Sequence, residues 1–122
     1  MSFRTAISGL NAATADLAVT ANNIANTSTT GFKGSRVQFA ELFAVSATGT
    51  SNTQAGNGVR VADVAQQFTQ GSIDFTDNSL DMAISGEGFF ILSDAGAQVY
   101  SRAGAFQVDR DGYVVNSRNQ RL

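Results

Sequence analysis

The first 27 residues carry an apolar repeat whose spacing alternates between four residues and three. An α-helix places such positions along one stripe, which is the a/d seam of a coiled coil. Alanine, the best helix former, is abundant between the repeat positions. The pattern therefore predicts a coiled-coil-type helix over residues 1–27. Its seam positions are Phe3, Ile7, Leu10, Thr14, Leu17, Ala21 and Ile24.

This seam needs a partner, because a lone helix of such length is only marginally stable in water. Residues 45–122 contain no comparable heptad run. Two partners remain open. One is the β-rich remainder of the same chain, and the other is a second chain or a C-terminal segment beyond this sequence. We favour the second partner, because the seam is narrow and regular, as in helix–helix pairing.

The rest of the chain has the texture of short strands. Residues 32–45 are apolar at spacings that fit a strand or a short helix equally well, and residues 46–58 form a loop without large apolar side chains. From Val59 onward, short alternating runs are separated by turn signals, which is typical of antiparallel strands. The runs lie around Val59–Val61, Ile73–Phe75, Met82–Ile84, Phe89–Leu92, Val99, Phe106–Val108 and Val114–Val115.

The expected fold class is therefore mixed, with an N-terminal helix followed by a mainly antiparallel and incomplete β domain. We expect three parts: the helix over residues 1–27, a connecting segment and loop over residues 28–58, and a partial β-rich domain over residues 59–122.

Composition excludes many kinds of chemistry. The 122 residues include no cysteine and no histidine, so disulfides, thiolate metal sites and a histidine base are absent. We expect no metal, no cofactor and no enzymatic activity. The formal net charge is −2, and no basic stripe of the kind that binds nucleic acid is present. No apolar run approaches the ~20 residues of a membrane span, and we identify no cleavable signal peptide.

Four local patterns have an ordinary explanation that outweighs the catalytic or ligand-binding one. Asp81 and Glu87 resemble a glycosidase pair only in residue type, since acids beside turns are common. A catalytic serine needs a base that activates it, and Lys33 is the only lysine that could serve, so serine–lysine catalysis is not favoured. Gly86-Glu87-Gly88 lacks the third glycine of a dinucleotide fingerprint and fits a tight turn with positive φ. Asp109–Gly112 lacks the later glutamate of a calcium loop and fits a hairpin turn.

The segment Asn22–Asn26 is unusual for a helix, because it holds three asparagines within five residues. Asparagine competes for backbone hydrogen bonds and is a poor helix former. The segment is therefore either a fraying helix end or a set of amides that hydrogen-bond a neighbour.

Three ordered motifs resemble the bacterial flagellar rod and hook family. The first combines Ser8–Ala13, Ala21–Asn26 and Thr30–Lys33, and its most specific residues are Asn22, Asn23, Ile24, Ala25, Asn26, Gly31, Phe32 and Lys33. The second combines Gly58–Val61, Phe68, Gln70-Gly71, Leu80–Ile84 and Gly88–Phe90. The third runs from Tyr100–Phe106 through Asp109 to Gly112–Asn116. Together they span nearly the whole chain.

Within the family, the start of the helix, Phe39–Phe43 and Leu80–Ser85 favour the hook members over the rod members. The resemblance implies a subunit of a curved, self-assembling tube that passes torque from rod to filament. The seam of the N-terminal helix would pair with a C-terminal helix to line that tube. The sequence stops at Leu122 and lacks both the family's C-terminal helix and the outer domain that hook members insert within the β region, so we expect an N-terminal portion.

The resemblance also implies partners and a location. They are other hook subunits, the distal rod, the hook cap, the hook–filament junction and the flagellar export apparatus, in an extracellular structure reached without a cleaved signal. A rod subunit is the alternative within the family. The alternative from another class is a secreted β-domain enzyme that acts on glycans through Asp81 or Glu87.

Overall fold

The computed structural model describes residues 2–42 and 56–122, which form two compact units. The first unit contains the residues up to Ala25 and Gly34–Gln67, and the second contains Asn26–Lys33 and Phe68–Leu122. This division differs from the expected parts, because the strand that begins at Val59 belongs with the helix rather than with the later strands. Most of the expected loop over residues 46–58 lies outside the described residues.

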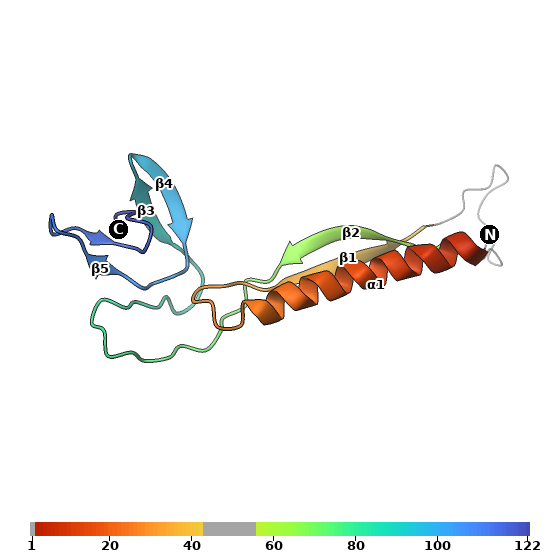
Figure 1. Ribbon diagram of the computed structural model, residues 1–122, viewed down its shortest axis with the longest axis horizontal. Helices are drawn as coiled ribbons and strands as arrows, with labels where there is room; N and C mark the ends of the chain where they lie inside the picture. The colour runs from red at the N-terminus through yellow and green to blue at the C-terminus, as the bar shows by residue number, and fades with distance from the viewer. Residues whose placement is uncertain (1, 43–55) are drawn as a thin grey trace. The chain divides into compact units, whose positions relative to one another are not determined.

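The first unit is a long helix beside a β-hairpin (Figure 1). The helix α1 spans Ser2–Ala25, close to the predicted range, and a turn follows it. The undecided segment after it forms strand β1, Ser35–Glu41, which pairs antiparallel with β2, Val59–Gln66. The register changes between Gln38 and Phe39, where a β-bulge twists the pair.

The second unit contains two short antiparallel pairs. Strand β3, Phe90–Asp94, pairs with β4, Ala97–Ser101, and β5, Gln107–Val108, pairs with β6, Val114–Val115. Arg121 connects the two pairs, because its backbone exchanges two hydrogen bonds with Ser93 and forms a bridge with Val115. The buried side chains Leu92, Phe106 and Val115 form the core between them.

The expected strands at Ile73–Phe75 and Met82–Ile84 are wrong. The structure contains no strand between Phe68 and Phe89, and Phe75 is 99% exposed. Alternation predicts a strand only where another strand is available to pair, and none of the described strands lies in register with this segment. Met82 makes a hydrogen bond of the type that joins strands, because its N–H donates to the carbonyl of Gly104 at 2.8 Å.

The fold class is nevertheless the predicted one: an N-terminal helix followed by small, open antiparallel pairs. None of the helices among the described residues is long and apolar enough to cross a membrane.

Candidate assembly surface

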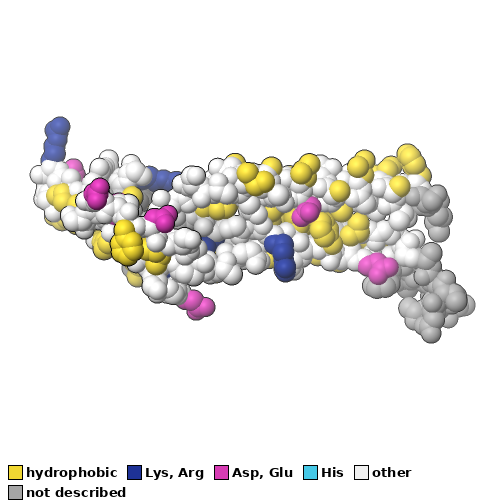
Figure 2. Space-filling model, turned by 90° about the horizontal axis from the view of Figure 1, so that it is seen from below, with side chains coloured by type: hydrophobic (Ala, Val, Ile, Leu, Met, Phe, Trp, Pro, Cys, Tyr) yellow, Lys and Arg dark blue, Asp and Glu magenta, His cyan; other side chains and the backbone are white. Residues whose placement is uncertain are grey.

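The seam of α1 lies on the surface. Four of its large side chains are between 65% and 76% exposed, and Ile7 is 42% exposed. Thr14 and Ala21, which occupy the other seam positions, are exposed as well. Hydrophobic side chains recur at intervals along an edge of the unit that contains α1 (Figure 2). The four side chains are Phe3, Leu10, Leu17 and Ile24.

The opposite face of α1 packs on the hairpin. Successive helical residues are turned by about 100°, so this face lies across the helix axis from the seam. Its side chains are mostly small, which lets the helix and the strands approach closely. The least exposed positions of the helix, which make up this face, are Ser8, Ala12, Ala15, Val19 and Asn23.

Two polar residues of this inner face hold the strands by hydrogen bonds. The Asn23 side-chain amide donates from Nδ2 to the carbonyl of Ser35 at 2.7 Å, and its Oδ1 accepts the Ser35 N–H at 2.9 Å. The Ser8 hydroxyl accepts the N–H of Val59 at 3.2 Å. Asn23 thus binds the first residue of β1 as another strand would, and its partner is in the same chain.

The remaining residues of the asparagine motif lie around the end of α1. Asn22 and Ala25 are exposed on the last turn of the helix. Asn26 belongs to the second unit, where its Oδ1 accepts the hydroxyl of Thr29 at 3.1 Å and its carbonyl accepts the Thr29 N–H at 3.0 Å. These bonds form the turn that leads away from the helix.

The Gly31-Phe32-Lys33 part of the motif is built into the second unit. Gly31 has a φ of +75°, and a Cβ placed there would lie 2.5 Å from the backbone nitrogen of Ala103. Only glycine meets both conditions. Phe32 is partly buried, and the Lys33 ammonium donates to the carbonyl of Thr69 at 2.8 Å.

Arg102 is a central residue of the second unit whose role the sequence did not reveal. Its guanidinium donates to Gln70 Oε1 at 2.9 Å and to the Ile84 carbonyl at 3.0 Å. It also donates to the carbonyls of Gly86 and Gly88. Guanidinium carries a fixed fork of donors that suits such a set of acceptors. The only sequence signal for the role of Arg102 was its position within the Tyr100–Phe106 motif.

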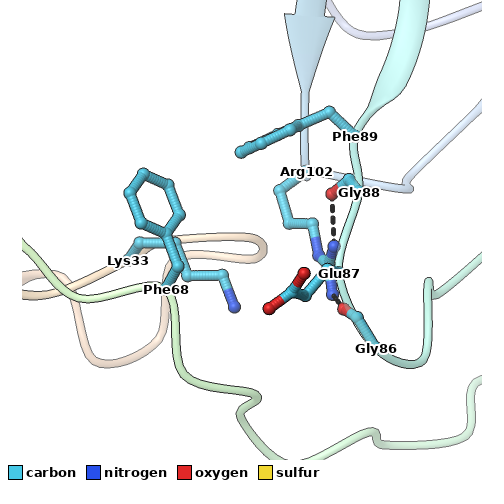
Figure 3. A pocket seen from close by; sticks show the side chains of 7 residues that line it. All are labelled: Lys33, Phe68, Gly86, Glu87, Gly88, Phe89 and Arg102. Atoms are coloured by element: carbon cyan, nitrogen blue, oxygen red, sulfur yellow. Dashed lines mark hydrogen bonds between the residues drawn. The ribbon is translucent and has the colours of Figure 1, made fainter.

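Arg102 borders an open pocket of about 320 Å³ in the second unit (Figure 3). The rings of Phe68 and Phe89 stand edge to face at a centroid distance of 6.1 Å. The side chains of Lys33 and Glu87 extend toward each other across the pocket (Figure 3). The lining residues are Lys33, Phe68, Gly86, Glu87, Gly88, Phe89 and Arg102.

The glycines at 86 and 88 fit the turn explanation rather than phosphate binding. Their φ values are +96° and +133°, as expected for a tight turn. Their carbonyls rather than their N–H groups face Arg102. A phosphate needs N–H donors at such a loop, and carbonyl oxygens repel it.

The other candidate groups also have structural partners. Asp81 accepts the Thr76 hydroxyl at 2.7 Å and the Asn78 amide at 2.9 Å, and it lines a different pocket from the one that holds Glu87. Asp109–Gly112 is the turn between β5 and β6, closed by the Gly112 N–H on the Asp109 carbonyl at 2.9 Å. Among the described residues, no three acidic side chains gather as a metal site would require.

Comparison with known families gives two matches along the chain. Residues 3–33 match the flagella basal body rod protein family, and this match includes all of α1 except its first residue as well as the asparagine motif. Residues 83–122 match the D1 domain of the flagellar hook protein FlgE/F/G, which covers most of the second unit.

Individual relatives match over longer stretches. The flagellar hook protein FlgE of Salmonella typhimurium is 46% identical over 100% of this chain, and that of Escherichia coli strain K12 is 45% identical over the same share. The flagellar basal-body rod protein FlgG of Buchnera aphidicola is 37% identical over 89% of this chain and 46% of its own length. The chain spans 29% of the length of the two hook proteins.

Proposed function

Because this chain belongs to the family of flagellar rod and hook proteins, we propose that it is part of a structural subunit of the bacterial flagellar hook. The hook is the curved tube that passes torque from rod to filament and acts as a universal joint. In this proposal the chain assembles with copies of itself, and it has no catalytic role.

The observation that carries the proposal is the exposed seam of α1. A helix in a monomer buries its large apolar residues and exposes its small and polar ones. Here the small face packs on the chain's own hairpin and the large apolar stripe is exposed. An exposed apolar stripe of heptad spacing fits a helix that pairs with a helix outside this chain, as the inner layer of a tube requires.

The remaining features of the proposal follow from membership of the hook branch. Its neighbours would be the distal rod, the hook cap and the hook–filament junction proteins. The flagellar export apparatus would deliver it to the cell exterior without a cleaved signal peptide. The scarcity of charge, 15% of residues, suits weak polar contacts that exchange as a curved tube turns.

The seam is tested by placing one charge on it and the same charge beside it. Leu10→Asp in the complete protein should abolish hook assembly, because the carboxylate would be buried in an apolar seam. Asn11→Asp adds an equal charge at the next residue, exposed and off the seam, and should assemble normally. Electron microscopy of isolated hook–basal bodies gives the readout. Normal hooks from Leu10→Asp would refute the seam as an assembly surface.

A rod subunit is the second candidate, favoured by the match of residues 3–33 to the rod protein family and by the FlgG relative. Immunogold labelling with an antibody to residues 59–122 separates the two. Label along the curved segment outside the cell supports the hook, and label confined to the straight rod supports the rod. A native-binding antibody that labels neither structure would contradict both.

A further inference from the structure

We infer that Phe75 of one copy docks into the Lys33–Arg102 pocket of a neighbouring copy. The pocket is defined by its lining residues Lys33, Phe68, Gly86, Glu87, Gly88, Phe89 and Arg102. The inference rests on the proposed self-assembly and names one contact through which that assembly proceeds.

Phe75 has the properties of an anchor. Its side chain is 99% exposed, although a phenylalanine gains strongly from burial. The residues that follow it are held in a fixed turn, since Asp81 accepts hydrogen bonds from Thr76 at 2.7 Å and from Asn78 at 2.9 Å. An anchor on an ordered turn loses little conformational entropy on binding.

The pocket has the properties of a receptor for that anchor. Its volume of about 320 Å³ admits a phenylalanine ring. Phe68 and Phe89, which are 59% and 46% exposed, already adopt the edge-to-face arrangement that a third ring can extend. One of its lining residues is fixed in place, because the Arg102 guanidinium donates to four acceptors.

Charge identifies the neighbouring copy as the occupant. Phe75 lies between Asp74 and Asp77, both exposed, and residues 61–101 contain no lysine or arginine. The pocket carries Lys33 and Arg102 against Glu87, which leaves it one positive charge in excess. The acidic anchor and the basic pocket are therefore complementary. Since they are different surfaces of one chain, the contact is heterologous and can propagate into a polymer.

Photo-crosslinking from position 75 tests the contact. A variant with p-benzoylphenylalanine in place of Phe75 is expressed beside the wild-type complete protein, so that hooks still assemble, and isolated hooks are irradiated. We expect a covalent dimer whose crosslinked peptide contains Phe68 or Glu87–Phe89.

Charge reversal supplies the matched control. Lys33→Glu in both co-expressed chains should lower the dimer yield by about tenfold, because every pocket then carries the reversed charge. Arg118→Glu in both chains, an exposed reversal in the same unit away from the pocket, should leave the yield within about twofold. Adding Asp74→Lys and Asp77→Lys to Lys33→Glu should restore the yield, which a misfolded pocket would not allow.

Hooks that assemble but crosslink only within one chain, or to residues outside the pocket, would overturn this inference and leave the proposed function standing. Absence of the protein from hooks would instead refute the proposed function.

Discussion

At the scale of single residues, the turn between β3 and β4 holds Ala95 at a positive φ, a backbone conformation that suits asparagine or glycine better than alanine. Ala95 and Gly96 connect the strands with φ values of 49° and 98°. Positive φ at both central residues is characteristic of type I′ turns, where Asn-Gly is preferred. We predict that Ala95→Asn stabilises the protein by about 0.5–1 kcal/mol, because asparagine tolerates the left-handed region better than alanine. Urea unfolding measures the change.

The matched control at that turn is Ala95→Val. A β-branched residue is poorly suited to positive φ, so the unfolding midpoint should fall. Equal midpoints for the asparagine and valine variants would contradict this account of the turn.

The two hydrogen bonds of Asn23 give a second prediction at this scale. Asn23→Asp keeps an oxygen that accepts the Ser35 N–H but loses the donor to the Ser35 carbonyl and opposes it with a carboxylate. We expect a loss of about 1–3 kcal/mol, since a partly buried hydrogen-bonding group is left unsatisfied. Hydrogen exchange at the amides of β1 should rise, whereas Asn11→Asp, exposed on the same helix, should leave it unchanged. Equal exchange in both variants would contradict the role of the Asn23 hydrogen bonds in holding β1 to the helix.

At the scale of elements, the sequence predicted α1 and its seam but not the packing of its inner face. The large apolar residues of the seam dominate the periodic signal. The small residues of the opposite face, such as Ala12 and Ala15, carry little hydrophobicity and read as generic helix formers. Their recurrence at spacings of three and four was nevertheless the sequence signal for close packing on β1 and β2.

The predicted strands are confirmed where local turn chemistry decides, and they are wrong where pairing with a distant strand decides. Asp94–Gly96 and Asp111-Gly112 lie at the turns of the two hairpins of the second unit, as their residue types indicate. The alternation at Ile73–Phe75 is equally regular, yet no described strand pairs with it. The role of Arg102 was invisible for a related reason, because its acceptors at residues 70 and 84–88 are distant in sequence.

The close packing of α1 on the hairpin can be tested by enlarging one inner side chain. Ala12 is 9% exposed, so Ala12→Leu must force the helix away from the strands and should cost about 1–3 kcal/mol. Ala18→Leu adds the same atoms at an exposed position of the helix and should change stability by less than about 0.5 kcal/mol. Thermal unfolding followed by circular dichroism compares them. Equal stability of the two variants would contradict the close packing of this helix face on the hairpin.

At the scale of the whole molecule, the boundary between units was the least predictable feature. The sequence placed the start of the β domain at Val59, because the alternating texture begins there. In the structure that strand pairs with β1, and the second unit takes in Asn26–Lys33 as well as the residues from Phe68 onward. The unit to which a segment belongs depends on which distant segment it pairs with. The local alternation of apolar and polar residues does not indicate that partner.

Each unit has buried residues of its own, and this gives the last prediction. Leu92 is 1% exposed in the second unit, so Leu92→Ala should destabilise that unit by about 2–5 kcal/mol. The neighbouring Ile91 is 56% exposed, and Ile91→Ala should cost far less. Because the units are separately compact, hydrogen exchange in Leu92→Ala should rise in β3–β6 while α1, β1 and β2 keep their protection. Equal loss of protection in both units would mean that they unfold as one cooperative body.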